Sequence, residues 1–435
     1  MRALLGRFRG IMRTSLLLLA LGSAFVAPAA LASAPKIPAD EDIGTRPAAT
    51  PGRSPTQIVA TDGEQTDAEE RTTGGGSQAM ELGHERHPAP PPQIATDPPG
   101  DWYLLHAGVR PHLGTFGGVA ALALAHERIE RFYGALSLSL IRNDAGSHYG
   151  GLQLALGRNL SDDFGGIAQI GIGENRARNF IGLGQVAVAY NRTVDTAALF
   201  QLAGYNRAKE FYGALQLGGY NRTDRAFGGL MQLGAFNHSR EDFTGFAQIG
   251  VFNAQGEDLF DESNDDGRFA GIAQAGVVNS AGNFRGIAQV GVASYSHDFI
   301  GGLQIGALGA GAKEFRGLAQ IGVVTMAEKS YGAQIGAGAI ALESHRGLQL
   351  GVAANYAESV HGAQIGIANI ADEAKGVQIG LFNHAKRLRG VQIGLVNHAE
   401  DGVLPWTAII NMGFGDDPNS DYSDYQAKGA SPTKF

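Results

Sequence analysis

The sequence predicts an all-β, repetitive antiparallel up-and-down β-barrel of about 20 strands, with a parallel β-solenoid of about 15 residues per coil as the alternative. Three observations lead to this prediction. One glutamine recurs at nearly fixed spacing, apolar residues alternate with small or polar residues around it, and short polar connectors separate the repeats. Self-similarity at a fixed period identifies a repeat architecture before any single segment is assigned.

The recurring glutamines lie 14 to 16 residues apart, except for one wider gap between Gln248 and Gln274. In the barrel they lie near the strand centres, so that reversing alternate strands still brings them side by side. The glutamines expected on the lumen face are Gln153, Gln169, Gln185, Gln216, Gln232, Gln248, Gln274, Gln289, Gln304, Gln320, Gln334, Gln349, Gln364, Gln378 and Gln392, and Gln201 completes the series along the chain.

Each repeat has the form Phe-x-Gly-h-x-Gln-h-Gly-h-h-Asn, where h is an apolar residue. In the segment Gly390–Leu395, aliphatic residues alternate with Gly, Gln and Gly, which is the period of a β-strand. The many glycines disfavour a helix by about 1 kcal/mol each. Between the repeats lie Asn, Asp, Ser and Lys, which favour turns.

The length of the connectors favours antiparallel pairing. A straight strand from Phe to Asn spans roughly 35 Å, at about 3.3 Å per residue. The remaining residues, about four, reach only about 14 Å at full extension, which suits a hairpin loop and not a return to the start of a parallel strand. A solenoid requires the segment to be broken into short sides, with the repeated glycines as corners.

The aliphatic face of each strand is expected to contact lipid, because Gly and Gln alone cannot fill the interior of so large a barrel. Strands of about 9 to 11 residues match the length that a tilted membrane strand needs. The Phe residues at the strand starts would then form aromatic belts. Two features argue against a conducting pore: the inferred lumen face has few charges, and the turns are uniformly short.

The expected function is therefore that of an outer-membrane β-barrel protein, either a pore or a structural component of the cell envelope. The expected partner is the lipid bilayer of the outer membrane of a Gram-negative bacterium. The alternative is a secreted or surface-exposed β-solenoid that acts as an interaction scaffold at the cell surface or in the periplasm.

The two ends of the chain differ from the repeat region. Residues 1–32 read as a signal peptide, with a basic start, an apolar stretch from Ser15 to Val26 and the small-residue cleavage site Ala30-Leu31-Ala32. Residues 33–100 form a Pro-, Gly- and acid-rich linker that is expected to be disordered, residues 101–415 form the repeat domain, and residues 416–435 form a second disordered tail.

No pattern for catalysis or cofactor binding is found, so we expect no enzyme, no cofactor and no identifiable small-molecule ligand. The net charge of -8 argues against a nucleic-acid partner. Asp261, Asp265 and Asp266 in the acidic insertion are weak calcium candidates, since a solvated loop is the favoured explanation and the glycine at the sixth position of an EF-hand loop is missing. His238, His384 and His398 each follow a repeat Asn and are expected to be exposed turn residues.

The units Gly376–Asn383 and Gly390–Asn397 resemble a bacterial surface-repeat family first noted in leptospiral lipoproteins, which carries tandem Gly-h-Gln-h-Gly-h-h-Asn units. That family ends in a Pro-containing segment and an Ile-Asn-x-x-Phe close, matched here by Leu404-Pro405-Trp406 and Ile410–Phe414. The resemblance covers about residues 150 to 414 and implies a location in the cell envelope. The chain has no cysteine, so the resemblance implies no lipid anchor.

Overall fold

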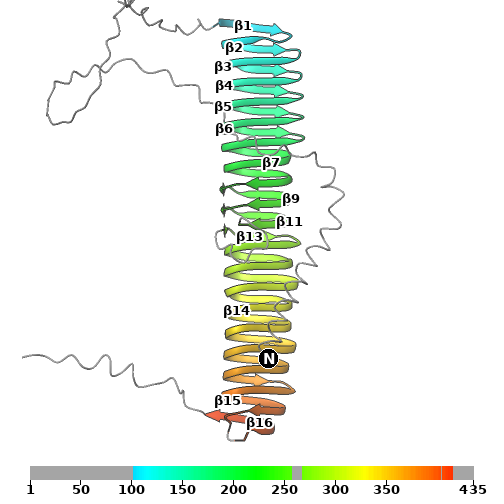
Figure 1. Ribbon diagram of the computed structural model, residues 1–435, viewed down its shortest axis with the longest axis vertical. Helices are drawn as coiled ribbons and strands as arrows, with labels where there is room; N and C mark the ends of the chain where they lie inside the picture. The colour runs from blue at the N-terminus through cyan, green and yellow to red at the C-terminus, as the bar shows by residue number, and fades with distance from the viewer. Residues whose placement is uncertain (1–100, 257–266, 403, 415–435) are drawn as a thin grey trace, which may run out of the picture. The chain divides into compact units, whose positions relative to one another are not determined.

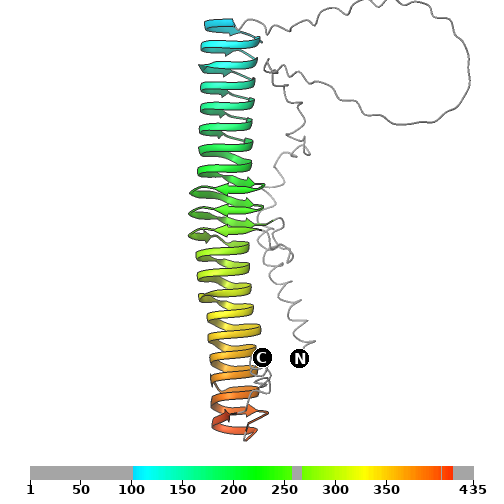
Figure 2. The same ribbon diagram turned by 90° about the vertical axis from the view of Figure 1, so that its left-hand side faces the viewer.

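The chain winds into a parallel β-solenoid of about 18 coils, as the computed structural model shows for residues 101–256, 267–402 and 404–414 (Figure 1 and Figure 2). The expected signal peptide, the 33–100 linker, the 416–435 tail and the calcium candidates Asp261, Asp265 and Asp266 lie outside the described residues. All the described elements are strands.

Sixteen strands are assigned, and two of them continue through several coils because pairing is not interrupted at the corners. The strands are β1 (Asp101–Gly108), β2 (His112–Ala123), β3 (His126–Ser139), β4 (Arg142–Ala155), β5 (Arg158–Gly171), β6 (Glu174–Ala187), β7 (Tyr190–Thr223), β8 (Ala226–Gly228), β9 (Met231–Ser239), β10 (Asp242–Thr244), β11 (Ala247–Gln255), β12 (Arg268–Ala270), β13 (Ala273–Ala275), β14 (Val278–Ile379), β15 (Phe382–Ala399) and β16 (Trp406–Phe414).

Successive coils pair in parallel and in register, so that equivalent residues lie directly above one another. In β4, β5 and β6, Gln153 pairs with Gln169 and Gln169 with Gln185. The antiparallel barrel, its lumen and its transmembrane strands are therefore wrong, and the parallel solenoid given as the alternative is confirmed. The one antiparallel pairing among the described strands joins β15 to β16 at the C-terminal end.

The stretch from Phe to Asn is not one straight strand, so the short connectors do not require hairpins. It bends at the glycines, so a short connector needs only to close the coil. A Cβ atom on Gly286 would lie 2.6 Å from the carbonyl oxygen of Gly271 in the coil before it. In the later coils the corner glycine has a positive φ, 133° at Gly376, where other residues are strained. The glycines therefore permit both the turn and the close approach of the coils.

One column of the interior is aromatic. Phe residues stack nearly parallel along a column from Phe116 to Phe315, in which His148 and Thr196 replace Phe in two coils, and the ring centroids of Phe284 and Phe299 lie 4.8 Å apart. They are fully or almost fully buried, so they form no aromatic belt at a membrane interface. In the last coils, which lose one residue before the glutamine, the equivalent positions are held by Ser330, His345, Val360, Ala374 and Leu388.

A second column consists of the repeat glutamines, all sixteen of which are at most 1% exposed. From Gln169 to Gln392, each Nε2 donates to Oε1 of the glutamine one coil earlier, at 2.6 to 3.0 Å. In several coils the same nitrogen also donates to a backbone carbonyl, as Gln289 does to Tyr295. At the end of the column, Nδ2 of Asn411 in β16 donates to Gln392.

A third column consists of asparagines and runs in the opposite direction. From Asn159 to Asn253, each Nδ2 donates to Oδ1 of the asparagine one coil later, at 2.8 to 3.0 Å. The column is interrupted after Asn279 and resumes from Asn355 to Asn397. Together, the glutamine and asparagine columns satisfy buried amides that would otherwise be costly.

We predict that Gly376→Ala destabilises the C-terminal coils by about 2 kcal/mol or more, because its φ is 133° and the new Cβ would meet the carbonyl oxygen of Gly362 at 2.0 Å. The matched control is Gly338→Ala, where a Cβ meets nothing within 4 Å. Denaturant unfolding of both variants checks the prediction, and equal stability of the two would contradict it.

We also predict that Gln289→Leu destabilises the middle of the solenoid by several kcal/mol, because Gln274 and Gln304 each lose a buried partner at a cost of about 1–3 kcal/mol per group. Amide hydrogen exchange should accelerate in the coils that contain these two glutamines. The neighbouring Val290→Ala, on the outer surface, should change stability by less than about 0.5 kcal/mol. Unchanged exchange in Gln289→Leu would show that the column does not stabilise the stack.

Candidate interaction surface

The outer surface of the solenoid is apolar along one side. We define the apolar window of each coil as the seven residues from two before the repeat glutamine to four after it. Apart from the glutamines, the sixteen windows contain only Gly, Ala, Val, Leu, Ile, Met and Phe, together with Tyr205 and Tyr220. Because the coils are in register, the windows form one continuous surface, called here the apolar face. Sixteen coils at about 4.8 Å each give it a length of about 75 Å.

The aliphatic side chains of the apolar face are exposed to solvent. In the row two residues before the glutamine, Ile287 is 62% and Leu318 is 75% exposed. In the row three residues after it, Val352 is 67% and Leu395 is 66% exposed. Soluble monomers rarely expose so large a contiguous apolar surface, which usually marks an interaction site.

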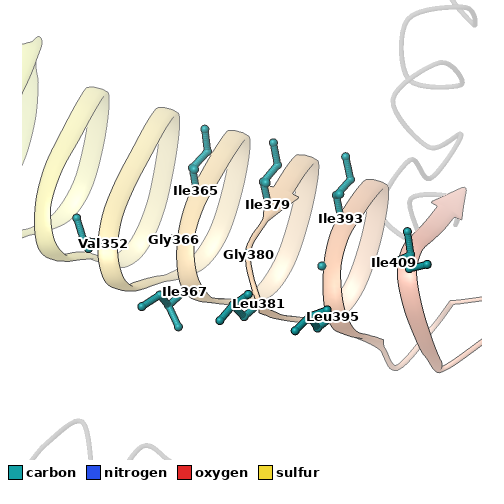
Figure 3. Close-up of a pocket in the computed structure, with 11 residues that line it drawn as sticks. Val352, Ile365, Gly366, Ile367, Ile379, Gly380, Leu381, Ile393, Leu395 and Ile409 are labelled. Carbon is teal, nitrogen blue, oxygen red and sulfur yellow. The ribbon is translucent and has the colours of Figure 1, made fainter.

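Near the C-terminal end the apolar face is hollowed into a groove of about 600 Å³ (Figure 3). Figure 3 shows Ile365, Ile379 and Ile393 on one side of it and Ile367, Leu381 and Leu395 on the other, with Gly366 and Gly380 between them. Ile409 of β16 closes the end of the groove and has a φ of 74°, which is rare for a β-branched residue. The walls are formed by Ile365, Ile379 and Ile393 and by Val352, Ile367, Leu381 and Leu395.

The charged residues lie outside the apolar windows. Arg207 and Arg222 both bond to Asp224, at 2.8 and 2.7 Å. Burial opposes ionisation of Asp224, but these hydrogen bonds and the positive charges outweigh it and hold the pKa of that carboxyl below its usual range. Arg316 and Glu314 pair at 2.7 Å on the open surface, where such a pair contributes little to stability.

Three ionisable groups of the described residues are fully buried in the interior, and burial lowers the pKa of one of them, His345, to about 4. His148 takes the place of a phenylalanine, stacked between Phe132 at 4.4 Å and Phe164 at 5.0 Å. Neither of its ring nitrogens has a hydrogen-bond partner, and burial lowers its pKa to about 3. Glu127 lies at the start of the asparagine column, where it accepts a hydrogen bond from Ser137 and burial raises its pKa to about 7. All three groups are core substitutions that cost stability in their charged forms.

The structure places the glutamines and histidines singled out from the sequence in surroundings other than those expected. The expected lumen-face glutamines point into a filled interior and line no lumen. His384 and His398 are not isolated turn residues, since their rings stack at 5.0 Å and His398 stacks on Trp406 at 4.0 Å. The described part of the chain contains no group of three or more His, Asp or Glu residues arranged to hold a metal ion.

Sequence reasoning missed His148 and Glu127. The signal for His148 was available, since it lies 16 residues after Phe132 and 16 before Phe164. Glu127 likewise precedes Asn143 by one repeat. The apolar face was recognised from its alternation, but it was assigned to the outside of a barrel.

Comparison of the chain with family models, with curated proteins and with solved structures gave no match. No helix long and apolar enough to cross a membrane occurs in the part of the chain that the structure describes.

We predict that His148→Phe removes part of an acid sensitivity of the N-terminal coils. The unfolded chain binds a proton at this histidine below about pH 6.5, but the folded chain does so only below about pH 3. Stability is therefore lost as the pH falls through this range. The gain from His148→Phe should be larger at pH 4.5 than at pH 7.5, as measured by denaturant unfolding.

The control is His112→Phe, which changes an exposed histidine of β2 and should leave the pH dependence as it is. A gain from His148→Phe that does not grow on acidification would contradict the assignment of a buried neutral imidazole.

Proposed function

We propose that this protein is an elongated interaction scaffold of the bacterial cell envelope, with a binding role and not a catalytic one. The observation that carries the proposal is the apolar face, which is uncharged and exposed in sixteen successive coils. Such a surface is costly to leave in water, so we infer that it is covered by a partner.

The interior makes the face suitable for this role. The parallel register fixes each exposed row, and the amide columns connect almost every coil to the next. A binding surface on such rigid elements loses little conformational entropy when a partner binds.

The envelope location rests on the chain ends and the repeats. The basic and apolar stretch up to Ala32 has the pattern of a signal peptide, and the repeat units resemble those of the surface-repeat family. A chain without cysteine needs no disulfides in an oxidising compartment, because hydrogen bonds and packing hold its coils together.

The test is fractionation of a Gram-negative host that expresses the full chain. The wild-type protein should be exported and retained with the envelope. A triple variant, Ile287→Glu with Leu318→Glu and Val352→Glu, changes three exposed positions of the apolar face and should be released in soluble form.

The control is Lys313→Glu with Ser344→Glu, which changes the net charge by the same three units outside the apolar windows and should be retained like the wild type. The proposal would be contradicted if the triple variant were retained as well as the wild type, or if the wild type accumulated in the cytoplasm.

A further inference from the structure

We propose that the apolar face binds the surface of an anionic lipid bilayer, with the solenoid axis lying parallel to the membrane. This inference rests on the proposed scaffold function and names its partner. It differs from the barrel prediction, since the solenoid lies on the bilayer and no strand crosses it.

The chemistry of the face suits hydrocarbon better than protein. A protein–protein interface typically carries about ten direct hydrogen bonds across a mixed polar and apolar surface. Apart from Tyr205 and Tyr220, the side chains exposed in the apolar windows offer no hydrogen-bonding group, because the only other polar ones are buried glutamines. Acyl chains need no such groups, whereas a second copy of the chain would find none to pair with.

One rim of the face carries tyrosines and cations. In each coil, the residue directly after the Phe-column position lies one or two residues before the apolar window. In the coils from Phe116 to Leu388, this residue is never Asp or Glu. The guanidinium groups of Arg316 and Arg346 lie 5.7 and 5.8 Å from the ring centre of Tyr331. This rim is formed by Tyr133, Tyr149, Tyr212, Arg285, Arg316, Tyr331, Arg346, Lys375 and Arg389.

The other rim also carries aromatic residues and cations, in the N-terminal half of the solenoid. Tyr205 stacks on Tyr220 at 5.1 Å and Phe236 on Phe252 at 4.9 Å, just before the asparagine column. The residue after the asparagine is an arginine in four successive coils, Arg176, Arg192, Arg207 and Arg222, although Asp224 offsets part of the charge of the last two.

An aliphatic surface bounded by tyrosines and by Arg or Lys is the arrangement found at the boundary between acyl chains and anionic headgroups. Carboxylates offset part of the rim charge, since Glu314 pairs with Arg316 at 2.7 Å and Glu373 with Lys375 at 3.2 Å, and further acidic residues gather in the hollow that contains Glu343, Glu358 and Asp372. Although the net charge of the chain is -8, charges more than about 8 Å from the headgroups are largely screened at physiological salt.

The experiment is co-flotation of the purified chain with vesicles of neutral phosphatidylcholine, and with vesicles that contain one quarter phosphatidylglycerol. The wild type should float with both and at least tenfold more tightly with the anionic vesicles. The triple variant of Ile287, Leu318 and Val352 should lose binding to both, whereas Lys313→Glu with Ser344→Glu should bind like the wild type.

A second variant separates the rim from the face. Arg285→Gln with Arg316→Gln and Arg346→Gln should lose the preference for anionic vesicles and keep the binding to neutral ones. Circular dichroism checks that each variant is folded.

Absence of wild-type flotation, or equal flotation of the triple variant, would overturn the lipid assignment. So would a dimer in sedimentation equilibrium that the triple variant abolishes, because a second copy would then cover the face. If retention in the envelope depends on the apolar face but the chain does not bind vesicles, the scaffold function is still supported and only the lipid assignment is rejected.

Discussion

The structure depends on the hydrogen bonds between buried amide side chains of neighbouring coils. A glutamine or asparagine inside a protein is tolerated only when its oxygen and nitrogen find partners, and here the partners are the equivalent residues one coil away. That requirement fixes the parallel register, since a slip by one residue would bring an amide against an aliphatic side chain. The register in turn places the outer aliphatic residues in straight rows and so creates the apolar face.

Much of the fold could be read from the sequence, but the direction of the coils could not. The period, the strand alternation and the separate grouping of Gln and aliphatic residues were all visible around Gln289 and Gln392. The choice between barrel and solenoid turned on whether the chain bends at its glycines. Gly286 and Gly376 are compatible with a straight strand when viewed alone, and only the close approach of the next coil shows that they are corners.

The wrong choice of a barrel also led to a wrong prediction of which residues lie at the surface and what they contact. In a barrel the aliphatic rows must face lipid and the glutamines must face a lumen, whereas in a solenoid the glutamines fill the interior and the rows remain exposed. The Phe residues show the difference most clearly, because Phe284 and Phe299 stack in the core and contact no membrane. The candidate surface was therefore found from alternation alone, while its geometry required the coordinates.

The opposite directions of the glutamine and asparagine columns have an electrostatic consequence. A row of amides that all donate the same way adds its bond dipoles along the axis, as the peptide groups of a helix do. Between Asn159 and Asn279 the two rows oppose each other, so their fields largely cancel. From Ser294 to Asn355 the asparagine row is interrupted while the glutamine row continues, and this stretch retains an axial polarity that the rest of the solenoid lacks.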